Sequence, residues 1–178
     1  MGQFVSDIRQ IRERARKNMD SGAVTTGYKV DRERVISVLN EVLATELVCV
    51  LRYKRHYFMS RGVHSESVKQ EFAQHAAEEQ QHADWVAERI VQLGGAPDFN
   101  PAELSRRSHS EYAPGDDLQS MIRENLIAER IAIESYSEIV RWLANDDPTT
   151  RRMVEDILKV EEEHADDMSN LLEKVVHD

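Results

Sequence analysis

The chain has 178 residues, of which 31% are charged, and its formal net charge is -10. Its single cysteine, Cys49, excludes an internal disulfide and a multi-cysteine zinc site, and predicts a reducing, cytoplasmic compartment. The acidic balance argues against a broadly basic nucleic-acid-binding face. No run approaches the ~18 consecutive apolar residues of a membrane span, and the first twenty residues resemble no secretory signal, so a soluble protein is expected.

Residues 1–27 are predicted to form an N-terminal arm that is partly basic. Within it, five arginine and lysine side chains outnumber three acidic ones. A short basic arm could contact phosphates, but a solvated chain end is the favoured interpretation. Residues 28–178 are predicted to form a single bundle.

Helical periodicity then dominates four long segments. The first begins near Asp31, a favourable N-cap, and stops at Gly62. Its apolar stripe runs from Val35 to Tyr57 in steps of three or four residues, except where Glu46 occupies a gap. The stripe therefore has a carboxylate at its centre.

The next two segments repeat this arrangement. One extends from Ser65 to the glycines at 94–95, which favour a helix end, and Glu79 lies on its apolar line. The other covers residues 116–145, with Glu129 in a gap of its stripe. Each helix is therefore predicted to direct one carboxylate inward.

The fourth segment opens at Asp147-Pro148, a cap followed by proline at the first helical position, and its stripe is interrupted by Glu161 and His164. No segment alternates as a strand would, so the predicted class is all-α. Short connections within each pair predict antiparallel neighbours. Residues 94–115, extended at ~3.3 Å per residue, would reach ~70 Å, which predicts a four-helix bundle with a long crossover between its second and third helices.

The sequence E-x-x-H-A-D occurs twice, at 79–84 and at 161–166. A tyrosine also follows seven positions after Glu46 and seven positions after Glu129. The chain therefore resembles two similar helix pairs related by pseudo-twofold symmetry. Since each glutamate lies near the middle of its helix, all four are predicted to meet at one level.

Four buried carboxylates at one level require protons or cations as compensation. Glutamate and histidine at i and i+3 lie on one helical face, so each E-x-x-H pair can bind one metal ion. Two divalent cations balance four carboxylates, and this donor set suits iron or manganese. The candidate metal-binding and catalytic residues are Glu46, Glu79, His82, Glu129, Glu161 and His164.

Other titratable residues are predicted to lie outside the site. Glu78, Glu162 and Glu163 are expected to be exposed charges. Tyr53 and Tyr136 could equally pack in the core or hydrogen bond to a ligand. The remaining histidines, which lack the alignment of the two E-x-x-H pairs, are expected at the surface or in packing: His56, His64, His75, His109 and His177.

Three stretches of the chain resemble the ferritin-like superfamily, specifically bacterioferritin and bacterioferritin-related Dps-like proteins. They are "NEVLATELVCVLRYKRHYF", "AAEEQQHADWVAERIVQLGGAP" and "ILKVEEEH". The resemblance, over roughly residues 28–175, implies terminal ligands at Glu46 and Glu129, bridging ligands at Glu79 and Glu161, and one histidine for each of two iron ions per subunit. It also implies a ferroxidase that oxidises Fe(II) to Fe(III) with O2 or H2O2 and stores mineral inside a hollow homo-oligomer.

Three departures from that pattern refine the expectation. Haem-binding bacterioferritins have methionine where this chain has Gln80, so no haem is expected. The chain ends about fourteen residues after His164, which leaves no room for a fifth helix and favours a 12-mer over a 24-mer. This chain also lacks the paired cysteines of some Dps-like relatives, since Ile131 stands at a position that resembles one of theirs. Two E-x-x-H pairs in one chain favour a metal site within each subunit, whereas typical Dps proteins have their site between subunits.

Two alternatives remain open at this point. One is a Dps-like DNA-protecting protein that uses the basic arm. The other is a soluble di-metal peroxidase or oxidase that does not store iron, ranked lower because the chain lacks a rubredoxin-type cysteine set. Manganese or zinc could substitute for iron at the site.

Overall fold

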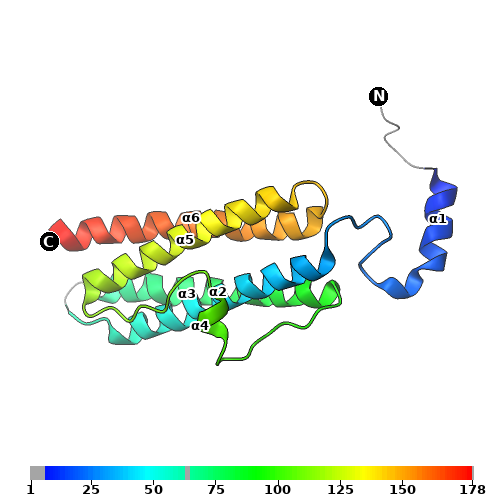
Figure 1. Cartoon of the computed structure of the whole chain (residues 1–178). Coiled ribbons are helices and arrows are strands. Elements are labelled where there is room, and N and C mark those ends of the chain that lie inside the picture. The colour runs from blue at the N-terminus through cyan, green and yellow to red at the C-terminus, as the bar shows by residue number, and fades with distance from the viewer. Residues whose placement is uncertain (1–6, 63–64, 178) are drawn as a thin grey trace.

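Four long helices lie side by side in the protein (Figure 1). The computed structural model describes residues 7–62 and 65–177, which contain helices and connecting loops and no strand. This confirms the predicted all-α class. The bundle consists of α2 (Arg32–Met59), α3 (Ser65–Gln92), α5 (Leu118–Leu143) and α6 (Pro148–His177).

Most helix ends follow the predicted start and stop signals, although α2 ends at Met59, three residues before the predicted stop at Gly62. The Asp31 carboxylate accepts a hydrogen bond from the backbone of Arg34 at the start of α2. Asp117 and Ser120 form a reciprocal capping box at the start of α5. Gly94, with φ of 80°, follows the end of α3 in a conformation that favours glycine. These local signals fix the helix lengths and hence the level of each inward-facing side chain.

The crossover between α3 and α5 runs back along the bundle, so that α5 starts at the end where α2 stops (Figure 1). It contains one short helix that the sequence did not predict, α4 (Leu104–Arg107). Leu104 packs against Ala44 and Val48 of α2. The crossover therefore covers one side of α2 and confirms the predicted topology.

Two larger apolar clusters fill the bundle, apart from the small cluster around Leu104. One lies toward the start of α2 and includes Leu39, Ile90 and Ile157. The other lies toward the end of α2 and includes Phe72 and Met168. The predicted stripe was wrong at Tyr57, which is 36% exposed, because the buried side of α2 continues through Arg52, Tyr53 and His56. Between the two clusters the helices present polar side chains.

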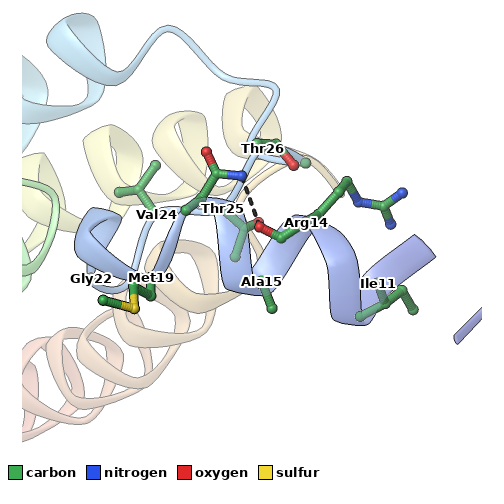
Figure 2. A pocket seen from close by; sticks show the side chains of 10 residues that line it. Ile11, Arg14, Ala15, Met19, Gly22, Val24, Thr25 and Thr26 are labelled. Atoms are coloured by element: carbon green, nitrogen blue, oxygen red, sulfur yellow. Dashed lines mark hydrogen bonds between the residues drawn. The ribbon is translucent and has the colours of Figure 1, made fainter. Parts of the chain in front are cut away.

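The described part of the N-terminal arm contains a helix, α1 (Ile8–Lys17), followed by a short 3-10 turn, η1 (Met19–Ser21). The sequence did not predict α1, because its only apolar residues, Ile8, Ile11 and Ala15, lie among six charged ones. It stands beyond the end of the bundle (Figure 1), and none of its side chains is buried. Figure 2 shows the pocket that α1 and its following loop line, where the Asn18 amide donates to the Arg14 carbonyl at 2.8 Å. The boundary at residues 27 and 28 stays a prediction.

A buried ion pair joins the loop after the arm to the bundle. The Tyr28 hydroxyl donates to Asp147 at 2.7 Å, and Arg89 of α3 donates to the same carboxylate at 3.1 Å. Asp147 also caps α6 by accepting from the backbone of Thr150 at 2.9 Å. One carboxylate thus connects the loop after the arm, α3 and the start of α6.

Candidate metal centre

The six predicted ligand residues converge at the middle of the bundle, between the two apolar clusters. α2 contributes Glu46, α5 contributes Glu129, and α3 and α6 each contribute one E-x-x-H pair. Every one of these side chains is at most 2% exposed. We call them the central cluster: Glu46, Glu79, His82, Glu129, Glu161 and His164.

The central cluster contains two overlapping sets of four potential ligands. Glu46, Glu79, His82 and Glu161 each offer a donor atom within 4.8 Å of the others. The second set replaces Glu46 and His82 with Glu129 and His164, again within 4.8 Å. Glu79 and Glu161 belong to both sets, so their positions suit carboxylates shared by two cations.

Distances across the cluster link the two helix pairs. Nδ1 of His82 lies 3.2 Å from Oε2 of Glu46 and 3.0 Å from Oε1 of Glu161. Nδ1 of His164 lies 3.4 Å from Oε1 of Glu79. Each histidine is also 3.8 Å from the glutamate three residues before it on its own helix. Each imidazole thus faces a glutamate of the opposite helix pair.

Several buried donor and acceptor atoms of the cluster have no hydrogen-bond partner among the described residues. They include Oε1 of Glu79, Oε2 of Glu129, both carboxylate oxygens of Glu161 and Nδ1 of His164. Leaving such atoms unsatisfied in a protein interior costs about 1–3 kcal/mol each. Divalent cations among these atoms would satisfy them together, and oxygen donors with a few imidazoles are a donor set for iron, manganese or zinc.

Two tyrosines fix the outer glutamates by hydrogen bonds that cross between the helix pairs. The Tyr53 hydroxyl, on α2, donates to Glu129 of α5, and the Tyr136 hydroxyl, on α5, donates to Glu46 of α2. Both tyrosine side chains are fully buried. The sequence left open whether these tyrosines pack in the core or hydrogen bond to a ligand. Each does both, because its ring packs in the core and its hydroxyl orients a carboxyl group.

The outer glutamates are held in their neutral form. Burial raises the pKa of Glu46 well above its usual range, and the charges of Glu161 and Glu79 raise it further. Burial likewise raises the pKa of Glu129, with added repulsion from Glu79 and Glu161. Without cations, these two carboxyl groups therefore retain their protons at neutral pH.

The two histidines and Glu79 are held in their charged forms instead. Burial opposes charge on His82, but the nearby carboxyl groups of Glu161 and Glu46 raise its pKa to about 12. Burial also opposes charge on His164, yet Glu161 and Glu79 raise its pKa to about 11. For Glu79, burial is outweighed by the two imidazoles, which lower its pKa below the usual range. In the absence of cations, protons on the two imidazoles compensate the charge of Glu79.

Residues 36–176 match the ferritin-like domain family. The chain belongs to the ferritin-like family. It is 26% identical over 147 residues to the bacterioferritin of Desulfovibrio desulfuricans, covering 82% of this chain and 78% of that protein. It is 25% identical over 138 residues to the DNA protection during starvation protein of Pyrococcus furiosus, covering 76% and 75%.

The bundle is also similar to solved ferritin-like structures. The bacterioferritin-related protein of Bacteroides fragilis, a dodecameric thioferritin, superimposes with a TM-score of 0.80 at 31% identity. The match covers 84% of this chain and 90% of that one. These similarities confirm the predicted family resemblance and the ferritin-like four-helix bundle with its long crossover.

Two residues beside the central cluster of this ferritin-like chain were missed from the sequence. Glu78 was expected to be a plain exposed charge, but it accepts a hydrogen bond from Nε2 of His164 at 2.8 Å and its side chain is only 35% exposed. His75 is fully buried, and its ring stacks on that of His164 with centroids 3.8 Å apart. Its position between Phe72 and Glu79 on the apolar line of α3 is the signal that could have identified it.

The other histidines have varied environments. His56 is buried and lies 3.2 Å from Asn125, whereas His109 of the crossover is half-buried, 3.6 Å from Glu41. His64 and the side chain of His177 lie outside the described residues. Glu162 and Glu163 are exposed as expected.

Within the described part of the chain, no helix has the length and apolarity needed to cross a membrane.

Proposed function

We propose that this ferritin-like protein is a ferroxidase that oxidises Fe(II) to Fe(III) at a two-metal site within each chain and stores the product inside a hollow homo-oligomeric shell. The observation that supports it best is the pair of overlapping, fully buried ligand sets that share Glu79 and Glu161. Their unpartnered oxygen atoms suit two cations held close together.

Each residue of the central cluster has a role in this proposal. Glu46 and Glu129 act as terminal ligands, and the tyrosine hydroxyls hold them in place. Glu79 and Glu161 would bridge the two ions, because both lie in both ligand sets. One imidazole completes each set, with Glu78 orienting His164 through the other ring nitrogen.

The chemistry needs the protein to hold two Fe(II) substrate ions at once. Each ion supplies one electron, and two electrons reduce O2 to H2O2 or H2O2 to water. Manganese or zinc would fit the same donors. The burial of the cluster excludes bulk water, and the pre-formed carboxylates stabilise the higher charge of Fe(III).

Storage requires a hollow homo-oligomeric shell, and two observations support one. Apolar side chains exposed on the single chain are expected at contacts between copies; they include Leu51, Phe58, Val91, Ile127 and Trp142. The Bacteroides fragilis relative is dodecameric, and we propose a shell of twelve subunits here also. We propose no haem, because Gln80 occupies the position of the haem-ligand methionine and its amide donates to Asp84.

Fe(II) loading of the metal-free protein in air tests the proposal. Oxidation is followed optically while retained iron is counted per chain. The Glu79→Gln variant should lose more than about 100-fold in initial rate, because even outer partners of metal ligands cost about 10–100-fold. Glu88→Gln, which removes an exposed carboxylate from the same helix, is the matched control.

The iron count separates storage from the alternative of a di-metal peroxidase or oxidase. Retention of hundreds of irons per assembly, with Glu79→Gln inactive, would support the storage ferroxidase. Saturation at about two irons per chain would leave a di-metal enzyme without a storage shell. Equal rates in the two variants would contradict the assigned site.

One observation favours DNA protection as a second candidate function. Helix α1 has five basic side chains and one acidic one, and none of them is buried. A gel-shift assay at low and moderate salt tests it, because phosphate-driven binding weakens steeply as salt rises. A chain lacking residues 1–27 should lose any DNA binding while it retains iron oxidation.

A further inference from the structure

A second group of potential ligands lies on the face formed by α3 and α6, beside the central cluster. It consists of Glu71 and His75 from α3 and Asp167 from α6, and we call it the lateral cluster. Each residue offers one donor atom, and these atoms lie within 4.8 Å of one another. None of the three residues belongs to the central cluster.

The ring of His75 is fixed so that one nitrogen faces the two carboxylates. Its Nδ1 lies 3.1 Å from the Tyr53 hydroxyl oxygen. Since Tyr53 donates its only hydroxyl proton to Glu129, His75 must donate the hydrogen bond from Nδ1. In the neutral imidazole, Nε2 is then an acceptor with a free lone pair.

That nitrogen has no hydrogen-bond partner among the described residues, although His75 is 0% exposed. Nε2 lies 3.4 Å from Oδ2 of Asp167 and 3.8 Å from Oε2 of Glu71. A buried lone pair at these distances from two carboxylate oxygens is unfavourable without a positive charge between them.

We propose that the lateral cluster is a third binding site in each chain, for a divalent transition-metal cation such as Fe(II) or Zn(II). Imidazole nitrogen and carboxylate oxygen are donors for these ions. Metal–ligand distances of about 2.0–2.2 Å place two ligands of a tetrahedral ion about 3.4 Å apart, close to the separations here. The hydrogen bond from Nδ1 to Tyr53 is the second contact that a metal-bound imidazole commonly has.

The lateral cluster is accessible, unlike the central one. The side chains of Glu71 and Asp167 are 38% and 48% exposed, so a cation can arrive from solvent and retain water ligands. His164 does not take part, because its Nε2 donates to Glu78. The inference goes beyond iron oxidation, because it concerns binding that needs no oxidant.

Equilibrium dialysis of the metal-free full chain against micromolar Zn(II) tests this site. The double variant Glu71→Gln/Asp167→Asn removes both carboxylates from partly exposed positions. We expect about three bound zinc ions per wild-type chain and about two per variant chain, one lost with each lateral site. An anomalous difference map from zinc-soaked crystals should place the lost ion beside Nε2 of His75.

The matched control is Glu88→Gln/Glu162→Gln, which removes the same charge from exposed positions on α3 and α6. It should bind as much zinc as the wild type. Equal zinc binding by the wild type and the lateral variant, or an equal loss in the control, would overturn the proposal. If the wild type bound one ion and the lateral variant none, the lateral site would stand and the proposed two-metal centre would fail.

Discussion

Filling the central cluster with Zn(II) should release protons, because four of its six side chains hold protons when no cation is bound. The raised pKa values of Glu46 and Glu129 keep both carboxyl groups neutral, and those of His82 and His164 keep both imidazoles charged. Each must lose its proton to bind a metal, which gives about four protons per chain for two cations. Binding should therefore tighten as the pH rises.

The number of protons released per chain should depend on pH in a distinctive way. With pKa values of about 12 and about 11, His82 and His164 are still charged at pH 8. The two imidazole protons should therefore be released in nearly constant amount from about pH 6 to about pH 8, whereas ordinary histidines with pKa about 6.5 would release almost none at the upper end. With about two protons per cation, the apparent binding constant of each ion should rise about 100-fold per pH unit.

The assay is a titration of metal-free protein with Zn(II) under argon in weak buffer, with a pH indicator reporting released protons. Glu88→Gln should match the wild type, since that carboxylate is exposed and distant from the cluster. Release of less than about one proton per chain at pH 8 would refute the protonation scheme. It would mean that the buried carboxylates are compensated in another way.

Five further substitutions test the site and the fold. Tyr53→Phe should slow iron oxidation by about 10-fold to 100-fold, because Tyr53 orients the proposed ligand Glu129. Glu79→Ala should slow it more, because Glu79 belongs to both ligand sets. Equal losses of rate in the two variants would contradict the bridging role of Glu79. Asp147→Ala should lower the free energy of unfolding, measured by urea denaturation, by about 3–5 kcal/mol, because it leaves the mostly buried Arg89 without its ion-pair partner. The control Asp156→Ala removes an exposed ion pair and should cost less than about 0.5 kcal/mol. Gly115→Ala should destabilise by at least about 1–2 kcal/mol in the same assay, because φ is 63° there and a Cβ would lie 3.1 Å from the backbone at the start of α5.

The bundle and the position of the central cluster followed from local patterns in the sequence. Glutamates interrupting apolar stripes at mid-helix, with histidine three residues later in two cases, are a periodic signal that needs no tertiary information. Caps such as Asp31 and Asp147 marked helix starts to within a residue. The ligand roles of these residues stay predictions, and the metal-binding measurements above test them.

The surroundings of the cluster were harder to predict, because they depend on pairing between helices. Tyr53 and Tyr136 could not be assigned to Glu129 and Glu46 without knowing that the hydrogen bonds cross between helix pairs. Glu78 lies at the edge of the α3 stripe, and only the approach of α6 brings it to His164. Helix α1 was missed because only three of its ten residues are apolar and none of its side chains is buried.

The sharing of Glu79 and Glu161 makes the two halves of the chain interdependent. Each four-ligand set takes three residues from one helix pair and one glutamate from the other. An isolated half could therefore complete neither set, and a half that shifted along its partner by one helical turn, about 5.4 Å, would open both. Cations bound in the cluster would therefore fasten the two helix pairs in a single register, so metal uptake and docking of the halves should stabilise one another.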